Sequence, residues 1–344
     1  NDDPGAAFAI TDGPDAPLSS VSFGRRCDDA RDPVAADTLF PIGSLTKSAT
    51  ALVVLDLLDK NRRSLSDTLD PGRGAPPVID LLRHSAGSRA GGLAAGAQRT
   101  QSQDGNRAAH FQAWFEPGEL WHYDNANYVE LARELDALGW DLSTAWANRF
   151  TKSGPQLGLS LAESVSSCEH TWVGGEPRAL HLQPSDDASP NLAGGAWASA
   201  SGVIELLRAI AAEPRTRSFA LPTLEGDRYG LGIRITGAGE HESWGHTGAG
   251  IGSWAWMRGD ASGRAAVVLS NRNVELADVR LQLREGFFHL DSPPAPTELP
   301  ADELAGAYGV RGWDEPAQIR SEDGELVLDA PSLGTAGVSL EPDG

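Results

Sequence analysis

A serine and a lysine one helical turn apart, Ser44 and Lys47, have the clearest capacity for chemistry in this sequence. Residues three apart share one face of a helix, and a helix start favours negative charge developing on the serine oxygen. Burial lowers the pKa of a lysine, so that its amine can accept a proton, which an arginine cannot do. The pair predicts a lysine-activated nucleophile. The alternative is a serine cap followed by a surface lysine.

Lysine is rare in this chain, and that rarity adds weight to the pair. The 28 basic residues include three lysines, Lys47, Lys60 and Lys152, and the others are arginines. A lysine kept in such a chain suggests a task that needs an amine able to lose its proton.

A second candidate is Tyr123-Asp124-Asn125, placed just before an expected helix. A phenol relays a proton when nearby cations lower its pKa from about 10. The Asn125 amide can hold a lysine or a substrate carbonyl. The competing interpretation is an ordinary turn before a helix.

A third candidate is His246-Thr247-Gly248 at the end of an expected strand, followed by the glycine-rich residues 249–252. Glycine lets the backbone approach a ligand closely, and its exposed N–H groups can bind an oxyanion. A phosphate-binding loop fits poorly, because the glycine spacing is not that of a dinucleotide site.

Strands at both ends of the chain and helices in the middle must position these residues. Apolar spacing predicts a hairpin over 6–10 and 21–24, and a buried helix from Ser44 to about Asn61. We expect helices over 77–84, 126–138, 142–150, 201–212 and 274–288, and strands over 229–236, 242–246, 253–258 and 265–270.

This order predicts an α/β fold: an antiparallel sheet flanked by helices, with an inserted all-α domain. The sheet domain is expected to be discontinuous, 1–70 plus 190–290, around a helical insert at 71–189. The proline-rich segment 291–300 reads as a linker. A short β-rich extension, 301–344, follows, with a strand–turn–strand signal around Asp323-Gly324.

Composition excludes several classes of function. The net charge of −20 over 344 residues disfavours binding to nucleic acid or to anionic lipid. The chain has no apolar run long enough for a transmembrane segment. His241 and His246 lack a third ligand at suitable spacing, so we expect no metal and no cofactor. Cys27 and Cys168 form one disulfide or remain two free thiols.

Together, Ser44-x-x-Lys47, Tyr123-x-Asn125 and His246-Thr247-Gly248 resemble the serine β-lactamase and DD-peptidase (penicillin-binding protein) superfamily over about residues 4–290. The closer resemblance is to class C β-lactamases and the related DD-carboxypeptidases and esterases. Flanking segments that add to it are 38–43, Leu81-Leu82-Arg83-His84-Ser85-Ala86-Gly87, Pro117-Gly118, Gly194-Gly195-Ala196-Trp197 and Tyr229-Gly230-Leu231-Gly232.

The resemblance implies a covalent acyl-enzyme route on a β-lactamase/transpeptidase-like fold. Each motif residue then has an expected role. Ser44 is the nucleophile, and Lys47 and Tyr123 share the roles of general base and general acid. Asn125 orients Lys47 and the substrate amide, and His246 lies beside Tyr123, where it aids proton relay and adds positive charge. The N–H groups of Ser44 and Ala249 form the oxyanion hole.

Other residues depart from the family pattern or are expected to bind substrate. His246 resembles the DD-peptidase and esterase branches, because class C β-lactamases usually carry lysine there. Ala249 replaces a hydroxyl residue that assists DD-carboxypeptidases. Asp124 is unusual in its motif and either repels anionic substrates or points to solvent. The expected substrate-binding residues are Thr247, Gly248, Trp254 and Arg234, which resembles an arginine that grips a terminal carboxylate.

The leading hypothesis is a serine hydrolase or acyltransferase acting on an amide or ester, expected to be that of a peptide with a D-residue. Its partners would be a small-molecule or peptidyl acyl donor and water or an amine. The alternative is a penicillin-binding-protein-type thioesterase or transacylase that cyclises or transfers a nonribosomal peptide or another natural-product acyl group. Residues 301–344 resemble the start of a small β-barrel that follows the catalytic domain in some relatives, cyclases among them.

Further alternatives are an esterase, a β-lactamase and a non-catalytic penicillin-binding sensor. A DD-peptidase would be secreted or periplasmic, and a biosynthetic transacylase cytoplasmic. A link to a carrier protein or to peptidoglycan stays open.

Overall fold

The computed structural model describes residues 5–27, 32–70, 72, 74–88, 115–150, 157–158, 167–173, 176–180, 191–223, 226–250, 252–272, 283, 287–288, 306–308, 317–322, 325–330 and 334–338. The chain forms two units, Asn1–Leu290 and Asp291–Gly344. A division of the first unit into a sheet domain and a helical insert stays a prediction. Within the described residues, no helix is both long and apolar enough to cross a membrane.

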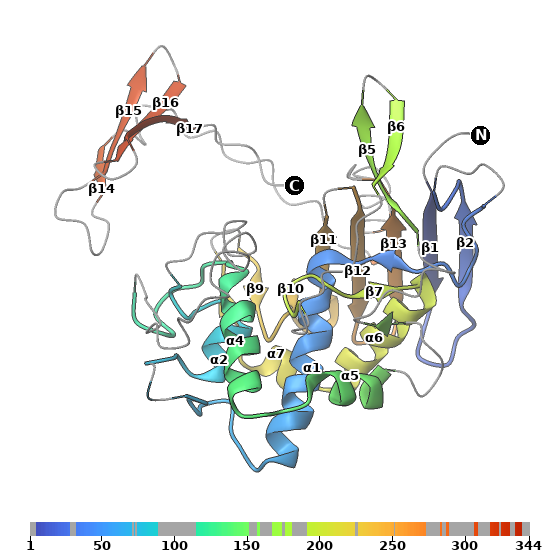
Figure 1. Cartoon of the computed structure of the whole chain (residues 1–344), viewed down its shortest axis with the longest axis horizontal. Helices are drawn as coiled ribbons and strands as arrows, with labels where there is room; N and C mark the ends of the chain where they lie inside the picture. The colour runs from blue at the N-terminus through green and yellow to red at the C-terminus, as the bar shows by residue number, and fades with distance from the viewer. Residues whose placement is uncertain are drawn as a thin grey trace. The chain divides into compact units, whose positions relative to one another are not determined.

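An eight-stranded antiparallel sheet supports the first unit (Figure 1). Its strand order is β2-β1-β13-β12-β11-β10-β9-β8. In that order the strands are Ser19–Phe23, Ala6–Thr11, Ala265–Ser270, Trp254–Asp260, Ser243–Ala249, Arg234–Thr236, Arg228–Tyr229 and Leu221–Pro222.

The two faces of the sheet pack against different partners, because successive side chains of a strand point to opposite sides. Ala255 and Met257 of β12 belong to the main core, which includes the buried residues of the helices. Trp254 and Trp256 of the same strand belong to a separate cluster that contains Phe288. His246 of β11 is the cross-strand partner of Met257 and therefore points to the face of the main core.

Helix α1 (Thr46–Lys60) is buried on nearly all sides, as its apolar sequence predicts. It packs between α6 (Ala200–Ala212), which lies against the sheet, and α5 (Leu142–Phe150) (Figure 1). The remaining helical elements are η1 (Gly43–Leu45), α2 (Val78–Leu82), α4 (Ala126–Ala137), α7 (Arg215–Ser218) and η4 (Gly239–His241).

Two sequence predictions need correction. The strand expected over 229–236 is two strands, β9 and β10, with a bend between them. Gly232 sits in that bend at φ +68°, where a Cβ would lie 2.4 Å from the Lys47 carbonyl oxygen, so only glycine fits this bend beside α1. The helix expected from Ser44 begins as the 3₁₀ turn η1, and α1 starts at Thr46. The helix expected over 274–288 lies outside the described residues, apart from positions 283, 287 and 288.

Two smaller sheets complete the described part of this unit. One has the order β3-β7-β4, from Phe40–Pro41, Trp197–Ala198 and Leu157–Gly158. The other is the hairpin of β5 (Glu169–Val173) and β6 (Glu176–Leu180). The segment expected to be mainly helical therefore also contains strands.

The second unit contains a four-stranded antiparallel sheet in chain order, β14-β15-β16-β17. Its strands are Gly306–Tyr308, Ala317–Glu322, Glu325–Ala330 and Gly334–Val338. The β15–β16 pair is the strand–turn–strand expected around Asp323-Gly324.

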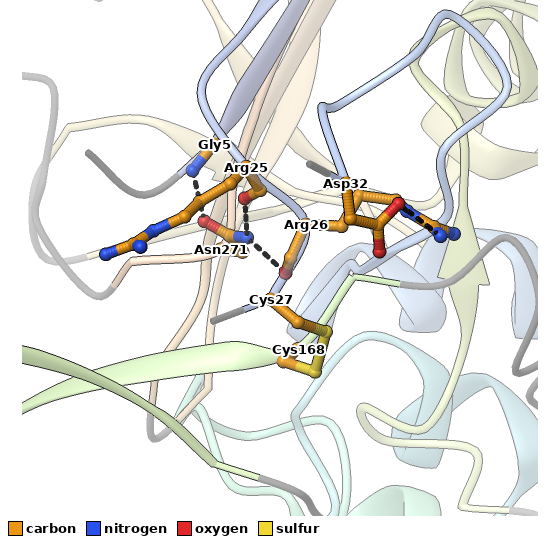
Figure 2. The surroundings of a disulfide bond; sticks show 7 residues. All are labelled: Gly5, Arg25, Arg26, Cys27, Asp32, Cys168 and Asn271. Atoms are coloured by element: carbon orange, nitrogen blue, oxygen red, sulfur yellow. Dashed lines mark hydrogen bonds and ion pairs between the residues drawn. A yellow bond between two sulfur atoms is a disulfide. The ribbon is translucent and has the colours of Figure 1, made fainter. Parts of the chain in front are cut away.

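A disulfide joins Cys27 to Cys168, 141 residues apart in sequence (Figure 2). The Cys168 N–H donates to the Arg26 carbonyl at 2.8 Å, and the Ser167 N–H donates to the Leu39 carbonyl at 2.8 Å. Because Leu39 lies shortly before Ser44, the bridge anchors a segment beside the chain that carries the candidate nucleophile.

The buried amide of Asn271 reinforces this junction (Figure 2). Its Oδ1 accepts from the Gly5 N–H at 2.6 Å, and its Nδ2 donates to the carbonyls of Arg25 and Arg26 at 2.9 Å each. One side chain thus joins the start of β1 and the end of β13 to the segment that holds Cys27.

Removal of the bridge is expected to lower the free energy of unfolding by up to about 5 kcal/mol, because reduction releases a long closed loop in the unfolded chain. Urea unfolding with and without dithiothreitol measures the effect. The Cys27→Ser/Cys168→Ser variant is the control, since reductant should not change its midpoint. Two titratable thiols in unreduced, denatured protein would contradict the assignment.

Candidate active site

Lys47 is completely buried, and its amine contacts the candidate nucleophile directly. The Lys47 Nζ donates to Ser44 Oγ at 3.0 Å and to the Ala193 carbonyl at 2.7 Å. Burial lowers the pKa of Lys47 from 10.5 to about 7, against an opposing effect of the Asp124 carboxylate. The surface-lysine alternative is wrong, and no capping hydrogen bond from Ser44 is present at the start of η1 or α1.

The carbonyl that holds Lys47 belongs to an irregular segment tied across the start of α1. The Thr50 hydroxyl donates to the Leu192 carbonyl at 3.0 Å, and the Ala196 N–H donates to Thr46 Oγ at 3.1 Å. These bonds on either side of Ala193 fix the direction of its carbonyl. The sequence analysis missed this contact, because backbone acceptors leave no residue-type signal.

Asn125 was expected to orient Lys47, but among the described residues no hydrogen bond joins the two. The Lys47 amine bonds to Ser44 and to the Ala193 carbonyl instead. Asn125 immediately precedes α4, and its side-chain Oδ1 is buried without a hydrogen-bond partner in the described part of the chain.

Tyr123 lies close to both Ser44 and Lys47. The Lys47 Nζ is 5.0 Å from the centre of the Tyr123 ring, and a hydrogen bond links Tyr123 to Ser44. Burial raises the pKa of Tyr123 to about 12, although Ser44 and Arg234 act in the opposite direction. The expectation of a lowered phenol pKa is therefore wrong: Tyr123 carries its proton at neutral pH and can donate it.

The backbone of Ala249 lies against the turn that carries Ser44. A Cβ placed on Gly43, at φ +49°, would be 2.8 Å from the Ala249 nitrogen, so glycine permits this approach. Gly250 donates to Ser253 at 2.9 Å, and hydrogen-bonded pairs alternate along an antiparallel ladder. The N–H of Ala249 therefore points away from β12. Because β10 pairs with β11 only up to Gly245, this stretch of the β11 edge is open on the β10 side.

His246 is buried and neutral. Its Nε2 is 2.8 Å from the Tyr229 hydroxyl, and its Nδ1 is 2.6 Å from the Thr247 carbonyl. Burial first, then the nearby Lys47, lowers the pKa of His246 to about 3. Its ring centre lies 6.0 Å from that of Tyr123. The positive charge expected of His246 is wrong; Lys47 and Arg234 are the cationic side chains that act on this cluster.

The expected substrate-binding residues separate into two groups. The Arg234 guanidinium lies 5.8 Å from the centre of a Trp121 ring and 3.6 Å from the Asp227 carboxylate. Thr247 is exposed on β11, and Gly248 packs so close to the Ile42 carbonyl that a Cβ would clash. Trp254 instead packs in the cluster on the opposite face of the sheet. A substrate-binding role for Trp254 is therefore not supported.

His84 and Asp124 form part of the site; no role was predicted for His84, and Asp124 was expected to repel anionic substrates or to point to solvent. His84, at φ +60°, accepts at Nδ1 from the Asp124 N–H at 3.2 Å, and its ring centre is 4.2 Å from that of Tyr123. Asp124 is buried, and its Oδ1 accepts from the Ala126 N–H at 2.9 Å, so the expectation that it points to solvent is wrong. The signal for His84 was its place in the 81–87 motif.

A serine bonded to a buried lysine, with a protonated tyrosine beside both and a strand-edge amide nearby, defines a serine acyl-transfer site. The family model for Beta-lactamase matches residues 2–289, and the chain belongs to this family. It is a serine hydrolase or acyltransferase. No match was found among the curated proteins.

Solved structures share the fold at low identity. SurE is 24% identical, with TM-score 0.68 over 99% of this chain and 86% of that chain. An octameric penicillin-binding protein homologue from Pyrococcus abyssi is 19% identical, with TM-score 0.66 over 99% and 88%. The D-amino acid amidase of Ochrobactrum anthropi SV3, complexed with D-phenylalanine, is 18% identical, with TM-score 0.59 over 78% and 86%.

The acylation rate is expected to rise with pH and level off above an apparent pKa near 7, because only the neutral Lys47 amine accepts the Ser44 proton. Asp124→Asn keeps the capping acceptor but removes the charge that favours the ammonium, so the rise should move to lower pH. Stopped-flow acylation by an activated ester across pH 5–9 measures both. A rate independent of pH, or a shift to higher pH in Asp124→Asn, would contradict this role.

Proposed function

We propose that the protein forms an acyl-enzyme on Ser44 and cleaves an amide or ester bond, that of a peptide with a D-residue. The observation that carries the proposal is the 3.0 Å contact between Lys47 Nζ and Ser44 Oγ, made by an amine whose pKa is about 7. At neutral pH a substantial share of the enzyme then holds a free base against its nucleophile.

The reaction proceeds in two transfers. The neutral Lys47 amine takes the Ser44 proton as Oγ attacks the carbonyl carbon, and the oxyanion is stabilised by the N–H groups of Ser44 and Ala249. The protonated Tyr123 donates to the leaving group as the scissile bond breaks, and the Lys47 ammonium restores the phenol proton. Water or an amine then attacks the ester, with the proton transfers reversed.

The open edge of β11 is an argument for a substrate that binds in an extended conformation. A strand edge offers N–H and C=O groups to a peptide that lies alongside it. Asn125 would hold the amide of the acyl group, and Arg234 would face a substrate carboxylate, with Thr247 and Gly248 along the edge. The D-configuration is supported by solved relatives: SurE was also solved with D-Leu, and the amidase with D-phenylalanine.

Transfer to an amine, as in a thioesterase or transacylase that cyclises or transfers a peptide or another acyl group, is the second candidate. The four-stranded sheet after residue 290 favours it, because a small β-barrel follows the catalytic domain in some relatives, cyclases among them. SurE and the Pyrococcus abyssi homologue also match over 99% of this chain. The acceptor, water or amine, separates the two candidates.

Intact-mass spectrometry tests the nucleophile. A fluorophosphonate and a penicillin should each add one mass increment to the wild-type protein and none to Ser44→Ala. The exposed Ser66→Ala variant serves as the matched control and should still be labelled. An unlabelled wild-type protein would exclude Ser44 as the nucleophile.

Matched D- and L-peptide esters and thioesters test the substrate class. We expect the D-acyl series to react at least about tenfold faster in kcat/KM, since about 1.4 kcal/mol of discrimination corresponds to one decade. Added amines report the acceptor through the ratio of amide to free acid. Equal rates for both series would contradict the D-specific proposal, and free acid alone would exclude the transfer alternative.

A further inference from the structure

Tyr229 is a buried phenol whose hydroxyl bonds to one side chain of the candidate site, His246, while its ring also packs against His84 and Tyr123. It lies at the end of β9, is 1% exposed, and its hydroxyl is 2.8 Å from His246 Nε2. The two rings meet edge to face, with centres 5.7 Å apart. Burial raises the pKa of Tyr229 well above 10, so its hydroxyl keeps its proton.

The partner of the other ring nitrogen decides the direction of this hydrogen bond. The Thr247 carbonyl, 2.6 Å from His246 Nδ1, can only accept, so Nδ1 carries the proton. In the neutral imidazole Nε2 then holds the lone pair, and the Tyr229 hydroxyl donates to it. Both nitrogens are thereby occupied, and neither is available to Tyr123.

The charged groups around His246 oppose a positive charge on its ring, and only the hydrogen bond to the Thr247 carbonyl acts to raise its pKa. Lys47 on α1 and Arg234 on β10 each lower its pKa, and His84 interacts with it electrostatically. The Tyr123 and Tyr229 rings face it as neutral groups. No carboxylate is among the causes that act on the pKa of His246.

We propose that Tyr229 is a positioning residue for the acyl-transfer reaction: its hydroxyl holds His246 as the neutral Nδ1–H tautomer, whose N–H orients the Thr247 carbonyl at the substrate edge of β11. His246 then transfers no proton during turnover, and Lys47 and Tyr123 carry out the proton transfers at Ser44. This role for His246 differs from the proton relay expected of it and rests on the proposed function of the site.

Imidazole ¹⁵N spectra of histidine-labelled protein, titrated with acid and base, test the assignment without turnover. His246→Gln identifies the signals. In the wild-type protein, His246 should show one protonated Nδ1 and one unprotonated Nε2, with no titration above about pH 5. In Tyr229→Phe the Nε2 signal should move downfield, because its donor is lost.

Kinetics of the same variants supply the functional readout. Tyr229→Phe should lower kcat about five- to tenfold, the effect of one hydrogen bond, with KM changed less than about twofold and the apparent pKa near 7 retained. Tyr128→Phe is the matched control: it removes an equally buried hydroxyl, bonded to the Leu82 carbonyl, and should leave the His246 signals in place.

Three results would overturn the proposal: titration of wild-type His246 between about pH 5.5 and 8, protonation at Nε2 instead of Nδ1, or an unmoved Nε2 signal in folded Tyr229→Phe. Because the wild-type titration needs no variant of Tyr229, a folding failure of Tyr229→Phe does not remove the test. Failure of the proposed function is separate, since it would show as the absence of a fluorophosphonate adduct on wild-type Ser44.

Discussion

Burial of one amine, that of Lys47, is the physical constraint around which the site is built. A displacement of its pKa from 10.5 to about 7 corresponds to about 5 kcal/mol against the ammonium in the folded protein. The Ala193 carbonyl and Ser44 Oγ each accept a hydrogen bond from the amine, which leaves the third N–H of an ammonium without an acceptor among the hydrogen bonds of the described residues. The fold thus brings the pKa of this amine close to neutral pH, at which an exposed lysine would remain charged.

The surrounding backbone approaches the amine and its serine closely, and glycines make this possible. Gly43 and Gly248 bring η1 and β11 together, and Gly232 lets the β9–β10 bend contact α1. Asp124 keeps the pKa of Lys47 from falling further. The turn η1, helix α1 and the edge of β11 therefore meet at Ser44 and Lys47. The disulfide holds the segment at 167–168, which is hydrogen-bonded to Leu39 on the chain just before Ser44.

The sequence predicted the parts of this arrangement that depend on residue type and periodicity. The buried helix after Ser44, the strands around His246, and the β15–β16 pair follow from apolar patterning and turn residues. Contacts made by backbone atoms were not predictable, as the Ala193 carbonyl shows. The neutral state of His246 and the protonated state of Tyr123 depend on burial by distant segments, which a motif does not report. Trp254 was misplaced because alternation along a strand does not say which face meets the helices.

The pKa of Lys47 tests the account most directly, and the composition of the chain makes it measurable. With three lysines in 344 residues, ¹³C-labelled lysine gives a spectrum in which each ε-methylene can be followed against pH. The account predicts that one signal, absent in Lys47→Arg, titrates near pH 7. Titration of the Lys47 signal near 10.4, the usual pKa of a lysine, would contradict it.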